Sequence, residues 1–468
     1  MSAPVTIRDL MTDPALFGDQ FGGDSFAAWR ALLAAFYGLE LSDDERETVM
    51  ALTGRAEVPS DAFAELWLAI GRRGGKSQVA ALIAVYEALF KDHRAKLSPG
   101  EVATVMAIAA DRKQARSVMR YVSGLVASNA MLARSKISET TEAIEFDNRA
   151  VIEVHTASFR SVRGYTLGAV IADEIAFWFS EGANPDKDII TALRPALATL
   201  GGKLVALSSP YAKRGILWDT HKRHFAGDST RVLVAQAPSL TMNPTLNPEI
   251  VADAMREDPE AARAEYLAEF RGDISTFLDI EVVEQATRSK PLTLPPQDRE
   301  TYFAFVDPNG GGADEFTMAI AHREDALTVI DGVWGRHGSP AAIAEEFASI
   351  LKTYRVSRVK GDRYAGRWPR DEFAKHNVTY EASDRDRSQL YLELMARLNS
   401  GAVILPPCQR MQRQLANLER RAHRSGRDTI DHPPGAHDDR ANAVAGAVAI
   451  AARPQLKSVT RRIAGGFY

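Results

Sequence analysis

Residues 66–77 read LWLAIGRRGGKS, and the chain continues in an Ala-rich stretch to Phe90. The apolar run Leu66–Ile70 predicts a buried strand, and Ser77–Phe90 predicts a helix. A strand, a Gly-rich turn and a helix that begins at Lys-Ser form the context of a phosphate-binding loop, whose backbone N–H groups cradle phosphates. We therefore predict that Gly71–Ser77 binds the phosphates of a nucleotide.

Two residues of this loop have specific expected roles. Lys76 is expected to reach the outer phosphates of ATP, and the Ser77 hydroxyl to bind Mg²⁺. The usual pattern has its first glycine where this chain has Ile70, so Gly71 is shifted by one position. A Gly-rich connection in an unrelated α/β protein is the alternative interpretation. The predicted ATP-binding residues are Gly71, Arg72, Arg73, Gly74, Gly75, Lys76, Ser77 and Asp173.

A second motif supports the first. Residues 167–174 read LGAVIADE, which is an apolar strand that ends in paired acids. We expect Asp173 to hold Mg²⁺ and Glu174 to polarise the attacking water. Either acid alone is consistent with an ordinary strand-end cap. The two motifs together, in this order along the chain, favour an ATP site.

A third predicted strand, Lys203–Leu207, ends in a pair of serines. The hydroxyls of Ser208 and Ser209 are candidates to sense the γ-phosphate and to couple its loss to the next segment. A Ser-rich turn after a strand is the alternative. The arginines that are candidates to stabilise charge during phosphoryl transfer are Arg72, Arg73, Arg160 and Arg163.

Strand-like and helix-like segments alternate from Leu66 to Leu207, which predicts a parallel sheet covered by helices. Apolar residues between Phe26 and Phe36 recur at helical spacing before it, and a second α/β domain follows the Pro-containing segment Lys290–Glu300. We divide the chain into a helical region (1–59), a P-loop core (60–224), a linker subdomain with the interdomain linker (225–298), a second α/β domain (299–453) and a tail (454–468).

Carboxylates stand at element boundaries in the second domain. Asp307 and Asp362 each follow a predicted strand. Asp438 and Asp439 open the final predicted helix, directly after His437. Acids delivered from two strands and a helix can converge on two divalent metals, which favour carboxylate oxygens. The alternative is solvated acids at element ends, where the two acids of the helix favour its N-terminus. For His437, the alternatives are a role as metal ligand or in orienting the attacking water, and a role in capping or packing.

Composition sets wider limits. Lys and Arg total 57 and Asp and Glu total 61, so the net charge is −4 and the chain is not globally basic, as a small DNA-coating protein would be. The single cysteine, Cys408, excludes a disulfide framework within the chain. The N-terminus has no secretory signal pattern, and no apolar run is long enough to span a bilayer. These features predict a cytoplasmic protein.

Taken together, the motifs resemble those of the large terminase subunits of tailed double-stranded DNA bacteriophages. The resemblance extends from about Phe26 to Ala452, and the shifted glycine is similar to the family's deviant phosphate loop. The stretches that carry the resemblance are Gly71–Ser77, Ile108–Ala115, Arg160–Gly164, Asp173-Glu174, Ser208–Pro210, Asn243-Pro244, Glu265–Phe270, Asp307-Pro308, Gly361–Gly366 and His437–Asp439.

The resemblance implies an N-terminal P-loop ATPase domain of the ASCE type and a C-terminal nuclease domain with a ribonuclease H-like fold. It implies ATP with Mg²⁺ in the first and two Mg²⁺ or Mn²⁺ ions in the second. The implied catalytic residues are Glu174, Asp307, Asp362, Asp438 and Asp439, and the implied metal ligands are Ser77, Asp173, Asp307, Asp362, Asp438 and Asp439. Asp438 and Asp439 compete for the role of third nuclease acid. Phe26 and Trp29 either contact adenine or pack in the core.

The implied activity is ATP-driven movement of double-stranded DNA into a procapsid, with cutting of the concatemer. Implied partners are the portal protein, a small terminase subunit and further copies of the chain in a ring, in the cytoplasm of the infected host and not in the mature virion. Two rivals remain. A host repair or defence translocase-nuclease would carry helicase motifs, which the sequence lacks. A decayed prophage remnant that binds DNA or portal is disfavoured by the presence of Lys76, Glu174, Asp307 and Asp362.

Overall fold

The computed structural model describes residues 4–157, 164–178, 185–308, 314–362, 367–422, 428–434 and 436–452. The chain divides into two compact units, Met1–Ser275 and Thr276–Tyr468, which we call the N-terminal and C-terminal units. The short strand β9, Ile274–Thr276, contains the division between them. The expected tail at 454–468 lies outside the described residues.

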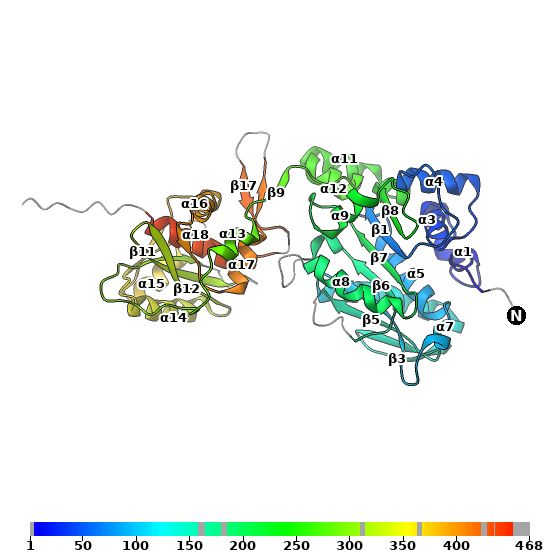
Figure 1. Ribbon diagram of the computed structural model, residues 1–468, viewed down its shortest axis with the longest axis horizontal. Coiled ribbons are helices and arrows are strands. Elements are labelled where there is room, and N and C mark those ends of the chain that lie inside the picture. Colours follow the sequence, from blue (N-terminus) through cyan, green and yellow to red (C-terminus); the bar gives the residue numbers. More distant parts are fainter. Residues whose placement is uncertain are drawn as a thin grey trace, which may run out of the picture. The chain divides into compact units, whose positions relative to one another are not determined.

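The N-terminal unit is built on an eight-stranded sheet in the order β3-β4-β5-β2-β6-β7-β1-β8 (Figure 1). All neighbours from β5 to β8 pair in parallel, and only β3–β4 and β4–β5 are antiparallel. The strands are β1 Glu65–Ile70, β2 Ala103–Ala109, β3 Lys136–Glu139, β4 Ala143–Phe146, β5 Ala150–Thr156, β6 Leu167–Asp173, β7 Lys203–Ser208 and β8 Val232–Ala237. Strand β7 separates β1, which precedes the Gly-rich loop, from β6, which ends in the paired acids. This is the strand order of the ASCE class of P-loop folds.

Helices cover both faces of this sheet, because side chains of successive strand residues point to opposite faces. Leu66, Leu68 and Ile70 pack with α3, α5 and α6 in one core, whereas Trp67 packs with α8 and α9 in another. The α-helices of the unit up to β8 are α1 Ile7–Thr12, α2 Gly18–Phe21, α3 Ala27–Phe36, α4 Asp43–Thr53, α5 Lys76–Leu89, α6 Arg112–Ser128, α7 Ala130–Ser135, α8 Pro185–Ala198 and α9 Gly215–His224. A capping box formed by Ser42 and Glu45 begins α4.

The sheet continues beyond the boundary that we expected at residue 224. Strand β8 is buried at its centre and pairs with β1, so it belongs to the core sheet. Its apolar run, VLVAQA, lies between polar segments, in the range 225–298 that the sequence analysis assigns to the linker subdomain. The helices α10 Ser239–Met242, α11 Pro248–Glu257 and α12 Pro259–Leu267 follow it.

The C-terminal unit has a six-stranded sheet in the order β14-β13-β10-β11-β12-β15. Its strands are β10 Phe303–Asp307, β11 Phe316–Glu324, β12 Leu327–Arg336, β13 Arg358–Gly361, β14 Thr379–Ala382 and β15 Val403–Ile404. Strands β10, β11 and β12 pair antiparallel in succession, and β13 and β14 extend the sheet in parallel from β10. This arrangement is a ribonuclease H-like sheet, as expected.

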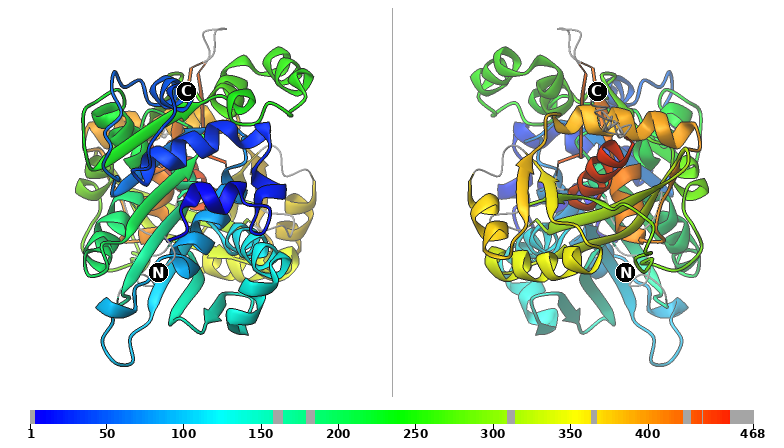
Figure 2. Two further views of the ribbon diagram at one scale, coloured as in Figure 1. Left: turned by 90° about the vertical axis from the view of Figure 1, so that its right-hand side faces the viewer. Right: turned by 90° about the vertical axis from the view of Figure 1, so that its left-hand side faces the viewer.

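The two faces of this sheet are also covered by helices. Phe305 packs with α16, α17 and α18, whereas its neighbours Ala304 and Val306 pack with α14 and α15. The remaining elements are α13 Ile280–Gln285, α14 Pro340–Thr353, α15 Trp368–Lys375, α16 Arg387–Asn399, α17 Gln409–Ala416, α18 Asp439–Ala451, and the antiparallel pair β16 Glu419–Arg421 and β17 Thr429–Asp431. Helix α18, red in Figure 2, packs on β10 and β11. It approaches closely at Gly446, where a Cβ would lie 2.1 Å from the Phe305 ring.

Among the described residues, no helix combines the length and apolar character that crossing a bilayer requires.

Candidate functional site

The Gly-rich loop joins β1 to α5, as the sequence predicted. Ile70 ends β1 with its side chain fully buried in the core. Glycine is required one residue later, because a Cβ on Gly71 would lie 2.3 Å from Ser239 Oγ and 2.6 Å from the Tyr266 carbonyl oxygen. The one-residue shift from the usual pattern therefore follows from the packing of the loop against the segments that come after the sheet.

Lys76 is the first residue of α5, and its ammonium group is buried beneath the loop. Its Nζ donates to the Ile70 carbonyl and to Ser209 Oγ, both at 2.9 Å, and lies 3.8 Å from a Glu174 carboxylate oxygen. Burial lowers the pKa of Lys76, and the nearby acids oppose that effect. A buried cation that faces a Gly-rich helix N-terminus is suited to bind phosphate.

The paired acids follow β6 at the same edge of the sheet. Glu174 accepts hydrogen bonds from Ser208 Oγ at 2.9 Å and from the Ser209 backbone N–H at 3.2 Å. Its backbone is left-handed, with φ 48° and ψ 45°, a region that non-glycine residues rarely adopt. Because functional sites often hold such conformations, this observation singles out Glu174 among the acids of the unit that the structure describes.

Asp173 lies deeper than Glu174. Burial, and secondly the charge of Glu174, raise the pKa of Asp173 to about 7. Within the described part of the chain, Asp173 Oδ1 is buried and has no hydrogen-bond partner. An uncompensated carboxylate oxygen beside a phosphate loop fits a Mg²⁺ ion, whose preferred ligands are oxygens.

Side chains from distant segments hold the loop in place. The indole N–H of Trp29 donates to the Gly74 carbonyl at 2.7 Å, and Asn243 Nδ2 donates to the Arg73 carbonyl at 2.9 Å. Trp29 is fully buried, so it packs in the core and also fixes the loop. Of the two alternatives for this residue, the structure supports packing.

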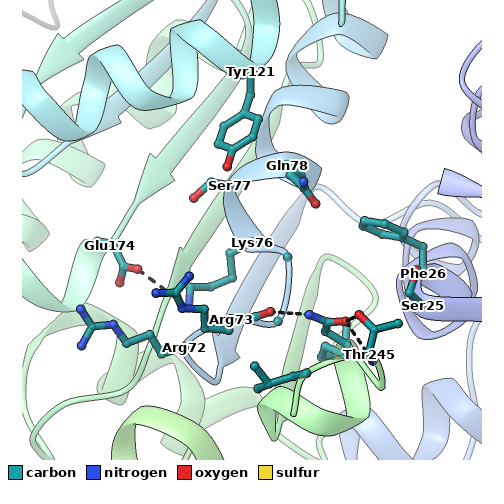
Figure 3. A pocket seen from close by; sticks show the side chains of 15 residues that line it. Ser25, Phe26, Arg72, Arg73, Lys76, Ser77, Gln78, Tyr121, Glu174 and Thr245 are labelled. Carbon is teal, nitrogen blue, oxygen red and sulfur yellow. Dashed lines mark hydrogen bonds and ion pairs between the residues drawn. The ribbon is translucent and has the colours of Figure 1, made fainter. Parts of the chain in front are cut away.

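A pocket of about 540 Å³ opens over the loop, within the roughly 300–1,000 Å³ typical of small-molecule sites. Figure 3 shows Lys76 and Glu174 on one side of it and Phe26 on the other, with Tyr121 above Ser77. A second pocket of about 430 Å³ shares Phe26, Gln78 and Tyr121 with the first. Phe26 thus lines the pocket, unlike Trp29.

The candidate arginines differ in their surroundings. Arg72 and Arg73 both line the pocket. Arg72 also forms an ion pair with Glu265 at 3.0 Å, and Arg73 has a positive φ of 128°. Arg160 and Arg163 lie outside the described residues.

In the C-terminal unit, Asp307 ends β10 and is partly buried. Asn442 Nδ2 donates to its Oδ2 at 2.8 Å. Burial raises the pKa of Asp307 to about 7, the Asn442 hydrogen bond and Arg387 oppose this, and the charges of Asp438 and Asp362 add to it. The charges of Asp362 and Asp438 therefore reach Asp307. Among the described residues, however, these three carboxylates do not form a group whose ligand atoms all lie within 4.8 Å of one another, so their convergence on metals stays a prediction.

One arginine lies among these acids. The guanidinium of Arg387, the first residue of α16, lies 3.3 Å from both carboxylate oxygens of Asp438 and 3.8 Å from Asp362 Oδ2. One helical turn later, Tyr391 OH donates to Asp438 Oδ2 at 2.7 Å. Burial opposes the charge of Arg387, but Asp438 and the other acids outweigh it and raise the pKa of Arg387.

Asp438 and Asp439 point into different surroundings. Asp438 is the N-cap of α18 and joins the cluster around Arg387. Asp439 Oδ2 accepts from the Glu315 backbone N–H at 3.2 Å. Ligand atoms of Asp439, Asp314 and His437 lie within 4.8 Å of one another. Burial raises the pKa of Asp439, and the charges of Asp314 and Asp438 contribute. The adjacent acids are thus not interchangeable.

The site contains residues that the sequence analysis missed: Arg387, Tyr391, Asp431, His432 and Asn442. Ligand atoms of Asp431, His432 and Asp438 lie within 4.8 Å of one another. The sequence contains a local pattern for Arg387, Tyr391 and Asn442. Arg387 and Tyr391 are four residues apart, and so are Asp438 and Asn442, which places each pair on one face of a helix. The oxygen-rich donor set of Asp307, Asp362 and Asp438 fits Mg²⁺ or Mn²⁺.

The fold and these two sites define a chain that joins an ASCE-type P-loop domain to a ribonuclease H-like domain. No protein-family model and no curated protein matches the chain. It is similar to the solved structure of the bacteriophage HK97 large terminase, at 15% identity over 90% of this chain and 99% of that one, with a TM-score of 0.38.

Two solved structures of single domains are similar to separate parts of this chain. The large terminase ATPase domain of Thermus phage P74-26 is 18% identical over 51% of this chain and 97% of that one, with a TM-score of 0.37. A large terminase nuclease from a thermophilic phage is 17% identical over 39% of this chain and 90% of that one, with a TM-score of 0.31. These structures come from the family that the sequence motifs resemble.

Proposed function

We propose that this chain is a large terminase subunit, which hydrolyses ATP to move double-stranded phage DNA into a procapsid and cuts the DNA concatemer. The observation that carries the proposal is the presence in one chain of two built sites. One has Lys76 between a Gly-rich loop and Ser209, beside Glu174. The other has Asp362 and Asp438 around one arginine, next to Asp307.

In the proposed ATPase site, the loop N–H groups and Lys76 bind the β- and γ-phosphates. The Ser77 hydroxyl and Asp173 hold Mg²⁺, which when bound neutralises charge that develops on the phosphates. Glu174 orients the attacking water and accepts its proton. Its left-handed backbone keeps the carboxylate at the pocket wall, and Arg72 and Arg73 are the candidate arginines that line the same pocket.

The same contacts suggest how hydrolysis is coupled to movement. Ser209 Oγ is a partner of Lys76, and Ser208 Oγ is a partner of Glu174. An arriving γ-phosphate competes for Lys76 and so weakens its bond to Ser209. We assign Ser208 and Ser209 as the coupling residues, because they belong to the segment that leads from β7 to α9.

The nucleotide base has a candidate position beside the loop. The rings of Phe26 and Tyr121 line both connected pockets, and the side chain of Gln78 lines them with its amide. Aromatic rings stack on a flat base, and an amide pairs with its edge. We therefore propose that adenine binds there, and that Trp29 contributes only by supporting the loop.

In the proposed nuclease site, Asp307, Asp362 and Asp438 hold two divalent cations, which when bound stabilise the attacking and leaving oxygens of a phosphodiester. Asn442 orients Asp307, and Tyr391 orients Asp438. Asp439 lies outside this cluster, and we assign it, with its hydrogen bond from Glu315 N–H, to the support of the α18 N-terminus.

The proposal extends to organisation and partners. We assign α10, α11 and α12 to the linker subdomain, and the C-terminal unit to the nuclease. DNA contacts are expected to be made mostly to phosphates, independent of sequence. A ring of copies on the portal protein, with a small terminase subunit, would assemble in the cytoplasm of the infected host.

The direct test is a packaging assay with purified procapsids, portal, ATP and phage DNA. Wild-type protein should protect DNA from added nuclease in an ATP-dependent way. Lys76→Ala should not protect DNA but should retain Mn²⁺-dependent cutting, whereas Asp362→Asn should lose cutting and retain ATP hydrolysis. Protection by Lys76→Ala protein, or loss of both activities in each variant, would contradict the assignment of two separate sites.

A further inference from the structure

Arg387 is a partly exposed cation that lies among several carboxylates. Its side chain is 36% exposed, whereas the Asp438 carboxylate that it contacts is 4% exposed. Its Nη1 also lies 3.7 Å from Asp431 Oδ1. A single guanidinium thus lies close to three carboxylates, and the charge of a fourth, Asp307, also acts on it.

Arg387 and Tyr391 hold Asp438 in different ways. Tyr391 is fully buried and donates one short hydrogen bond to Oδ2. Arg387 is placed at 3.3 Å from both Oδ1 and Oδ2, and its partly exposed head has a path to solvent. The tyrosine contact leaves lone pairs of Asp438 available for a cation, whereas the arginine lies against both oxygens.

We propose that Arg387 is an exchangeable counter-ion that occupies the divalent-cation site of the C-terminal unit and competes with the metal for Asp362 and Asp438. The inference rests on the proposed nuclease function. A cation bound at about 2.0–2.1 Å from these carboxylates cannot share their space with the guanidinium. Arg387 must therefore move toward solvent as the metal binds, which leaves its charge beside the metal site and available to a DNA phosphate.

This role has a consequence that a structural role would not have. Removing Arg387 should tighten metal binding, because it removes both a competitor and a positive charge close to the incoming cation. The same change should destabilise the metal-free protein, since the carboxylates lose their counter-charge. Mn²⁺ should then raise the melting temperature of the variant more than that of the wild type.

The test is calorimetric titration of the full chain with Mn²⁺, together with melting curves in EDTA and in Mn²⁺. Arg387→Gln is expected to bind Mn²⁺ at least about tenfold more tightly than wild type. Arg387→Lys keeps the positive charge but not the planar guanidinium, so its affinity for Mn²⁺ should lie between those of wild type and Arg387→Gln. This variant also provides the test if Arg387→Gln does not fold. Tyr391 contacts the same carboxylate but carries no charge, so Tyr391→Phe should not tighten the binding of Mn²⁺.

Asp362→Asn distinguishes the two ways in which the experiment can fail. If Asp362→Asn weakens Mn²⁺ binding and Arg387→Gln leaves it unchanged or weaker, the counter-ion role is wrong and the metal site stands. If Mn²⁺ binds wild type, Arg387→Gln and Asp362→Asn equally or not at all, the proposed metal site itself is wrong.

Discussion

Lys76 and Ser209 are joined by a hydrogen bond of 2.9 Å, although they lie in different β–α connections of the sheet. Strand β7, which leads to Ser209, is the direct neighbour of β1, which leads to the loop, so their carboxyl ends meet at one edge. The phosphate-binding lysine is thus in contact with the segment that we assign to coupling.

Lys76→Ala should reduce ATP hydrolysis by at least about a hundredfold, because the variant loses the buried charge that would stabilise the phosphates in the transition state. Phosphate release measured with saturating ATP checks this. Lys113→Ala, which changes an exposed lysine of the same unit, should behave like wild type. Normal turnover in Lys76→Ala protein would show that the loop is not part of the active site.

Ser208→Ala should uncouple the motor. Loss of the hydroxyl removes the 2.9 Å hydrogen bond to Glu174, which is worth about 1 kcal/mol, and leaves the Ser209 N–H bond in place. ATP hydrolysis should persist while the length of DNA packaged per ATP falls. Ser208→Thr retains the hydroxyl and should package normally, and an unchanged ratio in the alanine variant would argue against the coupling role.

Trp29→Phe should weaken ATP binding, because Gly74 in the loop loses its indole hydrogen bond of 2.7 Å. The unpaired carbonyl is also expected to lower the free energy of unfolding by about 1–3 kcal/mol. Trp67→Phe is a matched control, since Trp67 is equally buried but donates to Glu65 at 2.9 Å. Binding of a fluorescent ATP analogue should weaken only in the Trp29 variant; equal affinities would show that the loop does not depend on this bond.

Asp438→Asn should abolish Mn²⁺-dependent cutting, whereas Asp439→Asn should reduce it by about tenfold or less, as expected for a supporting residue. The reason is that Asp438 joins the acid cluster and Asp439 accepts from the Glu315 backbone. Cleavage of linear DNA by purified protein measures both, with Asp325→Asn, an exposed turn residue, as the control. The reverse ranking would reassign the third acid to Asp439.

The stability of the C-terminal unit should fall at alkaline pH. Burial opposes the charge of His322, but hydrogen bonds with Asp331 at 2.9 Å and Glu324 at 3.0 Å outweigh it and raise the pKa of His322 to about 9. A folded-state pKa above the unfolded value of about 6.5 stabilises the protein fully below pH 6.5. That contribution, at most about 3 kcal/mol, is lost as pH rises from 6.5 through 9.

Melting temperatures between pH 6 and 10 test this expectation in wild type, His322→Gln and His376→Gln. Only in His322→Gln should most of the decrease in melting temperature above pH 6.5 disappear. If its melting temperature declines as steeply as that of wild type, the buried pair does not account for the alkaline loss of stability.

Much of the fold was predictable because its signals are local. The predicted strands Leu66–Ile70 and Lys203–Leu207 and the predicted helix Ser77–Phe90 match β1, β7 and α5 to within one residue at each end, since the spacing of apolar residues lies within each segment. Strand β8 was missed because a short apolar run between polar segments carries little local signal, and its place in the sheet depends on pairing with β1.

The sequence by itself determined which residue types stand at the ends of which elements: a lysine after a Gly-rich turn, acids after β6 and β10, and two acids at the start of α18. Only the tertiary structure decided which of them meet. It separated Asp438 from Asp439, because adjacent residues at a helix start point in different directions. It also brought Arg387, Tyr391 and Asn442 to the acids, because these contacts arise when helices pack on the sheet, across separations that no local pattern records.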